Sequence, residues 1–230
     1  MIRNLILDAG GVMVYPFHGY WDIPMKYREL MGDYAREVGS PAWIAALPMA
    51  REHLREDRFV SGMEEEFTLR LAFLRTMHDA LGWNMTEEQL RLLAEDFTCN
   101  EGRYAWFDDV DVYLEKWRGT YRIGILSDAM PSFLNVAKKH DVQGYFEEIV
   151  ISTHVGITKP DARMYRAICD KMQLRPDECL FVDDKICNLE GALACGMQAV
   201  QMDRSGKIPL WNGPIVHNFS ELDRYMEENP

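Results

Sequence analysis

Residues 5–12 read LILDAGGV. Three apolar residues, Leu5 to Leu7, lead directly into Asp8, and the pair Gly10 and Gly11 follows. A short apolar run that ends in turn-forming residues is typical of a buried parallel strand that leaves its sheet through a tight turn. The stretch therefore predicts the first strand of an α/β sheet, with Asp8 at the carboxyl end of that strand.

Five later apolar runs resemble this first strand. Four are strong and the last is weaker: residues 123–126, 149–151, 180–182, 199–202 and 215–216. Between them, apolar residues recur at helical spacing, as in Met164, Ile168 and Met172. Strands that alternate with helices form a parallel sheet covered on both faces. We therefore expect a three-layer, doubly wound α/β fold with a Rossmann-like core.

A helical insertion is expected after the first strand, because residues 14–103 carry helical periodicity and almost no strand signal. Thr86 and Gln89 form a capping box that starts one helix. Another helix is expected to start after Ser40 and to end or kink at Pro48. We predict two structural units: an α/β core from residues 1–13 and 104–230, and an inserted α-helical cap subdomain from residues 14–103.

Composition restricts the partners and the compartment. The formal net charge of -12 argues against a nucleic-acid partner, because phosphate contacts need clustered Lys and Arg. The five cysteines lack metal-ligand spacing, so we expect reduced thiols rather than a disulfide framework. The apolar runs are too short for a membrane span. We expect a soluble, cytoplasmic protein without a membrane partner; its oligomeric state does not follow from the sequence.

Polar residues follow the predicted strands at the point where each one ends. Asp8 ends the first strand, Ser127 ends the second, Lys159 lies in the loop after the third, and Asp183 and Asp184 end the fourth. Ligands of a parallel sheet bind beyond the carboxyl ends of its strands, so these groups are expected to converge. Three clustered carboxylates raise one another's pKa values unless a cation neutralises them. The pattern therefore predicts a bound cation, and Mg²⁺ prefers such oxygen ligands.

Four motifs together resemble the haloacid dehalogenase-like superfamily. They are LILDAGGV (5–12), GILSDA (124–129), TKPDARMY (158–165) and CLFVDDKICNLEGA (179–192), in that family's order and across the whole core. The long gap between Asp8 and Ser127 resembles members whose helical cap is inserted after the first strand. The DxGG first motif resembles a branch of this superfamily that includes sugar-phosphate phosphatases. The resemblance implies a hydrolase that attacks a phosphate ester with the carboxylate of Asp8.

This chemistry assigns a role to each candidate residue. A carboxylate attacks phosphorus only if the repulsion between two anions is cancelled, which Mg²⁺ and an ammonium group achieve together. Lys159 is expected to neutralise the nucleophile and the transferred group. Asn188, four residues after Asp184, is expected to point back at the site. We expect Asp8, Asp183, Asp184 and the carbonyl of Gly10 to bind Mg²⁺, and Ser127 with the backbone amides of Gly10 and Gly11 to bind the phosphoryl oxygens.

The sequence departs from many phosphatases of the superfamily at Gly10. Those enzymes carry a second Asp two residues after the nucleophile, which protonates the leaving oxygen. General acid catalysis contributes roughly 10²–10⁴ in rate, so a replacement acid or a good leaving group is expected. His18 and Asp128 are the two candidates for this replacement.

Three functions are compatible with these motifs. The first is Mg²⁺-dependent hydrolysis of a small phosphomonoester, with a sugar phosphate as the suggested substrate. The second is metal-free dehalogenation of a 2-haloacid, although the family's dehalogenases carry a Tyr at the position of Gly10 and lack the acidic pair. The third is a non-catalytic binding protein, which would not need Asp8 and Lys159. Phosphomutase activity is disfavoured because it depends on the acid that Gly10 replaces.

Two groups of side chains outside the motifs have open interpretations. The aromatic residues Tyr15, Phe17, Tyr20 and Trp21 either line a substrate pocket or pack the cap against the core. The arginines Arg51, Arg55 and Arg58 either form a solvated helix face or reach an anionic part of the substrate.

Overall fold

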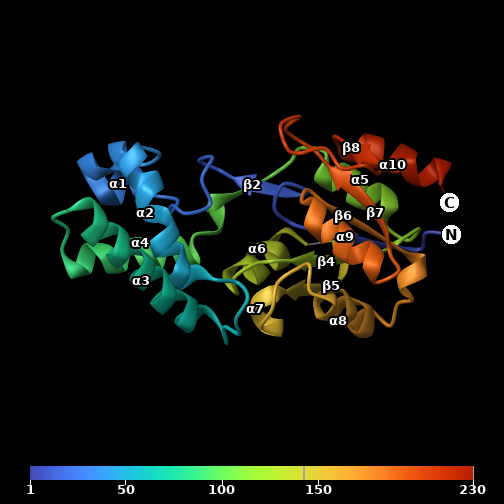
Figure 1. Ribbon diagram of the computed structural model, residues 1–230, viewed down its shortest axis with the longest axis horizontal. Helices are drawn as coiled ribbons and strands as arrows, with labels where there is room; N and C mark the ends of the chain where they lie inside the picture. Colours follow the sequence, from blue (N-terminus) through green and yellow to red (C-terminus); the bar gives the residue numbers. More distant parts are fainter. Residues whose placement is uncertain (142, 230) are drawn as a thin grey trace.

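The computed structural model describes residues 1–141 and 143–229 and contains a six-stranded sheet (Figure 1). Every neighbouring pair in this sheet is parallel, and the strand order is β5-β4-β1-β6-β7-β8. The strands are β1 (Asn4–Leu7), β4 (Arg122–Ser127), β5 (Phe146–Ile151), β6 (Cys179–Asp183), β7 (Gln198–Met202) and β8 (Ile215–Val216). Each contains one of the six predicted apolar runs, so the predicted doubly wound sheet is confirmed.

Strand β1 lies at the centre of the sheet, between β4 and β6. Its side chains alternate between the two faces, as the pleat of a strand requires. Leu5 and Leu7 belong to one buried hydrophobic cluster and Ile6 belongs to another. Because both faces are covered, the strand is apolar throughout, and Asp8 is the first residue beyond it that carries a charge.

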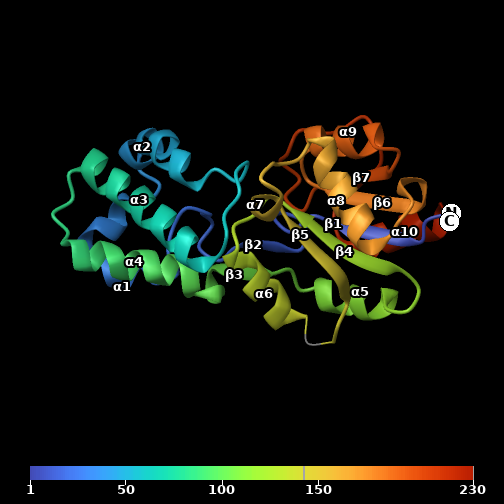
Figure 2. The ribbon, with the colours of Figure 1, turned by 90° about the horizontal axis from the view of Figure 1, so that it is seen from below.

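Helices cover both faces of the sheet, as Figure 2 shows. Helices α5 (Val110–Trp117), α6 (Ser132–His140) and α10 (Phe219–Glu228) pack on the face that carries Leu5, and helices α8 (Ala162–Met172) and α9 (Ile186–Ala194) pack on the face that carries Ile6. The short helices α7 (Ser152–Val155) and η4 (Pro176–Glu178) lie in connections. The predicted Met164, Ile168 and Met172 stripe is buried on α8, as its fourfold spacing indicates.

A second group of helices lies beyond the carboxyl ends of the strands, and we call it the cap (Figures 1 and 2). It comprises α1 (Tyr27–Met31), η1 (Gly32–Glu37), α2 (Pro41–Arg51), η2 (Glu52–Leu54), α3 (Met63–Leu81) and α4 (Glu87–Cys99). These helices enclose a hydrophobic cluster of their own. The antiparallel strands β2 (Val14–Pro16) and β3 (Tyr104–Trp106) connect the cap to the core, and η3 (Glu101–Arg103) precedes β3.

The predicted helix starts in the cap are present. Ser40 accepts a hydrogen bond from the Trp43 N–H, and the capping box of Thr86 and Gln89 is complete. Helix α2 does not end at Pro48 but continues to Arg51. Proline removes only one hydrogen bond, and the apolar side chains around it, such as Leu47, are buried in the cap.

Glu66 on α3 connects the cap to the core. Its buried carboxylate accepts hydrogen bonds from the backbone N–H of Ser132 at 2.6 Å and from the Ser132 hydroxyl at 2.7 Å, at the start of α6. The same carboxylate forms an ion pair with Arg70 at 2.6 Å. Because all of these groups are buried, this contact fixes the start of α3 against the edge of the sheet where the predicted site residues lie.

Candidate active site

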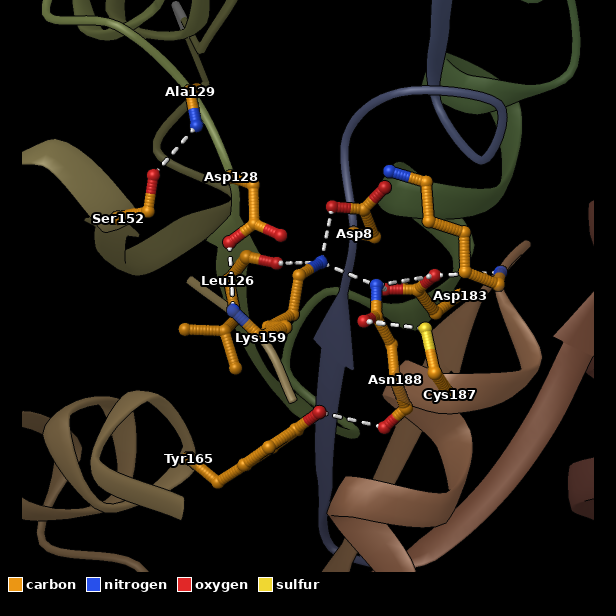
Figure 3. Close-up of polar contacts among 11 residues, drawn as sticks. Asp8, Leu126, Asp128, Ala129, Ser152, Lys159, Tyr165, Asp183, Cys187 and Asn188 are labelled. Carbon is orange, nitrogen blue, oxygen red and sulfur yellow. Dashed lines mark hydrogen bonds and ion pairs between the residues drawn. The ribbon is translucent and has the colours of Figure 1, made fainter. Parts of the chain in front are cut away.

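Lys159 lies between two carboxylates at the carboxyl end of the sheet (Figure 3). Its Nζ donates to Asp8 Oδ1 at 2.6 Å, to Asp183 Oδ2 at 2.7 Å and to the carbonyl oxygen of Leu126 at 3.0 Å. These three acceptors use all three protons of the ammonium group. One acceptor comes from β4, one from β6 and one from the residue directly after β1, so the order of the central strands brings the site together.

The charge states of this group follow from burial and from neighbouring charges. Burial disfavours the ammonium form of Lys159, but the carboxylates of Asp183 and Asp8 outweigh it and raise its pKa above the ordinary value. Burial raises the pKa of Asp8 to about 6, although Lys159 acts in the opposite direction. Asp8 is therefore mainly ionised above neutral pH, and only one of its oxygens is bonded to Lys159.

Asp183 is held from several directions. Its Oδ1 accepts the backbone N–H of Lys185 at 2.8 Å, and the side-chain amide of Asn188 donates to both carboxylate oxygens at 3.0 and 3.1 Å. The Tyr165 hydroxyl donates to the Asn188 carbonyl oxygen at 2.7 Å. Asn188 does point back at the site, as the sequence predicts, but what it contacts there is Asp183. These bonds orient Asp183, which in turn orients Lys159.

Asp184 has an unsatisfied oxygen beside this network. Its Oδ1 is buried and has no hydrogen-bond partner among the described residues. Burial, together with Asp8 and Asp183, raises the pKa of Asp184 to about 7. One ligand oxygen each from Asp8, Asp183 and Asp184 lie within 4.8 Å of one another. Buried carboxylate oxygens at this spacing fit a divalent cation, because it would supply the missing partner and oppose the mutual repulsion.

The two glycines after Asp8 allow other groups to approach closely. Gly11 has a φ of +75°, and a Cβ at this position would lie 2.8 Å from Asp184 Oδ2. A Cβ on Gly10 would lie 3.5 Å from the Trp21 ring. The Gly11 N–H already donates to the Val14 carbonyl oxygen at 2.8 Å. It is therefore used within the loop, against the prediction that it binds a phosphoryl oxygen, whereas no partner within the described chain occupies the Gly10 N–H.

A cavity of about 630 Å³ opens between the cap and the carboxyl ends of the strands. The structure brings seven of the predicted site residues to its wall, namely Asp8, Gly10, Gly11, Ser127, Asp128, Lys159 and Asp184. Asp128 Oδ1 accepts the backbone N–H of Lys159 at 3.0 Å, and burial raises the Asp128 pKa. A volume of this size is within the range that holds small ligands.

His18 does not lie with these residues. It is absent from the cavity wall, and its Nε2 lies 2.9 Å from the Met25 carbonyl oxygen, with its ring packed on Tyr27. A hydrogen bond and an aromatic contact therefore hold it inside the first loop of the cap. The prediction that His18 contacts the substrate or replaces the missing acid has no support in this geometry.

The aromatic residues and the arginines that the sequence left open each divide into residues that line the cavity and residues that do not. Tyr15 and Trp21 line the cavity, whereas Phe17 and Tyr20 are exposed and do not contribute to it. Among the arginines, only Arg51 lines the cavity, and it is ion-paired with Asp22. The other two make local contacts: Arg55 is ion-paired with Asp57, and Arg58 donates to the His53 carbonyl oxygen.

The cavity also contains charged residues that sequence reasoning missed. Glu56, Arg70, Arg103 and Lys185 line its wall. Burial, and then the nearby Asp128, raise the pKa of Glu56 to about 8. No local motif marks the first three of these residues, because their positions depend on how the cap packs on the core. Lys185 directly follows the acidic pair, which is a signal that could have identified it.

The sequence pattern of the haloacid dehalogenase-like hydrolases matches residues 8–196, which include Asp8, Lys159 and the acidic pair at Asp183 and Asp184. The fold and the site define an α/β hydrolase with an aspartate at the end of its first strand. The chain belongs to the haloacid dehalogenase-like hydrolase family. None of the described helices has the length and apolar character needed to cross a membrane.

Relatives of two different activities resemble the chain. It is 34% identical over 118 residues to phosphatase MT3486 of Mycobacterium tuberculosis, covering 49% of this chain and 52% of that protein. It is 29% identical over 155 residues to (S)-2-haloacid dehalogenase 4A of Burkholderia cepacia, covering 61% of this chain and 67% of that protein. The chain thus spans about half to two thirds of the length of these relatives.

Solved structures share the whole fold. The L-2-haloacid dehalogenase from Xanthobacter autotrophicus aligns with a TM-score of 0.68 and 16% identity, covering 99% of each chain. A phosphatase of the same superfamily from Thermococcus onnurineus aligns with a TM-score of 0.64 and 17% identity, covering 98% of each chain. At such low identity the likeness establishes the fold and leaves the reaction to the residues of the site.

Proposed function

We propose that this hydrolase is a Mg²⁺-dependent phosphatase that acts on a small phosphorylated metabolite. One observation carries the proposal: the buried Oδ1 of Asp184 has no partner among the described residues and lies in a cluster with Asp8 and Asp183. Dehalogenation of a haloacid needs no cation to offset the nucleophile, so a third carboxylate with an unsatisfied oxygen has no use there. A phosphate dianion, in contrast, needs positive charge beside the attacking carboxylate.

The metal would be held by Asp8 and Asp184, with Asp183 or the Gly10 carbonyl as further ligands. Bound there, Mg²⁺ would supply charge neutralisation between the nucleophile and the phosphate. The chain's own residues do the remaining work. Asp8 Oδ1 is held by Lys159, which leaves the other oxygen to attack phosphorus. The bond between phosphorus and the ester oxygen breaks, and an aspartyl-phosphate forms on Asp8.

The leaving oxygen requires a proton that Gly10 is unable to provide. Glu56 is the group we assign to this step, because it lines the cavity from the cap side. Its raised pKa keeps it protonated at neutral pH. Asp128 is less suited, because its Oδ1 already accepts the Lys159 N–H, which favours the ionised form. Water then attacks the aspartyl-phosphate, releasing phosphate and restoring Asp8.

Dehalogenation of a 2-haloacid is the second candidate, because a relative of that activity matches 61% of the chain. Gly10 weighs against it, since the family's dehalogenases resemble one another in having a Tyr at this position. The same protein preparation can test both reactions.

The experiment measures phosphate release from a panel of small phosphomonoesters, with sugar phosphates included, and halide release from 2-chloropropionate. Each assay runs with Mg²⁺ and with a chelator, beside the variant Asp8→Asn. We expect phosphate release that needs both Mg²⁺ and Asp8, and no halide release. Equal turnover by wild type and Asp8→Asn, activity that ignores the chelator, or metal-free halide release would each refute the proposal.

A further inference from the structure

Two buried arginines form part of the cavity wall on the cap side. Arg70 lies on α3 and Arg103 ends η3, and their side chains flank the ring of Phe97. Only 3% of Arg70 and 8% of Arg103 are exposed. These are different residues from the arginines that helical spacing singles out, and the phosphatase mechanism does not use them.

Arg70 already has a counter-charge. Its Nε donates to Glu66 Oε1 at 2.7 Å, and a second nitrogen of the guanidinium lies 2.6 Å from the same oxygen. Glu66 is fully buried and is also bonded to Ser132. Arg70 and Glu66 therefore form a neutral, fixed unit of the wall.

Arg103 has no such partner. Its guanidinium donates to the Trp21 carbonyl oxygen at 3.5 Å and to the Tyr104 hydroxyl, and no carboxylate within residues 1–141 and 143–229 forms an ion pair with it. Burial, and then the charge of Arg70, lower the pKa of Arg103 to about 10, which leaves it charged at neutral pH. A buried charge without a counter-ion is unfavourable by several kcal/mol, about the scale of ion desolvation.

Two other cations of the wall are paired with carboxylates. Arg51 is matched by Asp22, and Lys159 is matched by Asp8 and Asp183. Glu56 holds a proton at neutral pH. Of the three arginines in the wall, Arg51 and Arg70 are ion-paired with carboxylates, whereas Arg103 has no ion-paired carboxylate among the described residues.

We propose that Arg103, backed by Arg70, is an anion subsite that binds a carboxylate of the substrate in the same cavity as the phosphate. The substrate class is then a small phosphomonoester that carries a carboxylate. This rests on the proposed phosphatase function, which places the phosphate at Asp8. A carboxylate suits the site better than a second phosphate because it carries one negative charge, and its two oxygens match the planar guanidinium.

The test compares two phosphate esters of similar size. 2-Phosphoglycerate carries a carboxylate where glycerol 2-phosphate carries a hydroxymethyl group. Charged hydrogen bonds of about 1.5–3 kcal/mol correspond to a preference of roughly 10- to 100-fold in kcat/KM for the acid. Arg103→Met keeps much of the apolar volume and is expected to abolish this preference, with glycerol 2-phosphate changed only a few-fold. Arg55→Met, at an exposed cap arginine outside the cavity, is the matched control and should retain the preference.

Calorimetric binding of the same two esters to the wild-type protein, without turnover, gives a second readout. A binding preference for the acid without phosphate release would refute the phosphatase and leave the subsite in place. Phosphate release from both esters at equal efficiency would refute the subsite and leave the phosphatase. A third outcome would also overturn the proposal: Arg103→Met and Arg103→Lys could each reduce the hydrolysis of the two esters by the same factor. Arg103 would then have only a structural role.

Discussion

Gly11 faces the carboxylate of Asp184 so closely that a methyl group on it would lie 2.8 Å from Asp184 Oδ2. The φ of Gly11 is +75°, in the left-handed region that side chains avoid. The structure therefore explains the glycines of the DxGG motif. The loop after β1 must turn tightly, and it must leave room for the carboxylate of Asp184, which directly follows β6.

Gly11→Ala is expected to lower both stability and Mg²⁺ affinity. The left-handed backbone costs about 1–2 kcal/mol for alanine, and displacement of Asp184 is expected to weaken metal binding by about 10-fold. Gly206→Ala is the matched control, because Gly206 has a φ of +66° and nothing within 4 Å of the added Cβ. Thermal unfolding and Mg²⁺ titration measure the two effects. Equal Mg²⁺ affinity in both variants would contradict the role given to Gly11.

Lys159→Met should destabilise the metal-free protein in a pH-dependent manner. Removing one partner of a buried ion pair costs about 3–5 kcal/mol. Without the ammonium, the pKa of Asp8, already raised to about 6, rises further. Below that pKa the protonated Asp8 carboxyl needs no counter-charge, so the loss of stability should be smaller near pH 5 than near pH 8, although the contact with Asp183 is lost at both.

Urea unfolding in chelator at the two pH values tests this expectation for Lys159. Lys171→Met, which removes an exposed ion pair with Glu148, serves as the control. It should lower the free energy of unfolding by less than about 1 kcal/mol at both pH values. A difference between wild type and Lys159→Met that does not vary with pH would argue against the charge balance described for the site.

Glu56→Gln should slow the hydrolysis of alkyl phosphates by about 10²-fold or more, whereas p-nitrophenyl phosphate, with a good leaving group, should change only a few-fold. In the wild type the alkyl-phosphate rate should fall above pH about 8, because the acid must hold its proton and the pKa of Glu56 is raised to about 8. That fall should be missing in the variant. Should Asp128→Asn produce this pattern instead, the proton donor would be Asp128.

Glu66→Ala is expected to destabilise the protein by about 3–5 kcal/mol, because it leaves Arg70 buried without its carboxylate and removes both hydrogen bonds to Ser132. Chemical denaturation measures the effect. Glu64→Ala, at an exposed position two residues earlier on α3, should remain within about 0.5 kcal/mol of wild type. A similar loss in both variants would mean that helix propensity, and not the contact between cap and core, accounts for the change.

The fold and the central residues of the site were predictable because both depend on short-range patterns. An apolar run followed by a polar residue marks a buried strand and its end, and parallel strands place their carboxyl ends along one edge. Asp8, Lys159 and Asp184 were identified in this way, and the structure places them in one cavity. Their catalytic roles remain proposals that the experiments above test.

The cap shows where this reasoning stops. Glu56, Arg70 and Arg103 reach the cavity only through the packing of the cap against the core, which local periodicity does not encode. His18 lies close to Asp8 in sequence but is held by Met25 and Tyr27 inside the first cap loop. Nearness in sequence therefore misplaced one candidate, while three relevant residues carried no motif at all.

The amino-acid sequence by itself determined the parallel α/β sheet, the inserted helices, and the polar groups that follow β1, β4, β5 and β6, because each is specified within a few neighbouring residues. Only the tertiary structure decided which carboxyl lines the cavity from the cap side, and, among the described residues, which oxygen of Asp184 lacks a partner and which buried arginine has no counter-ion. These properties depend on distances between segments far apart in the chain, and on the burial that changes the energy of a charge.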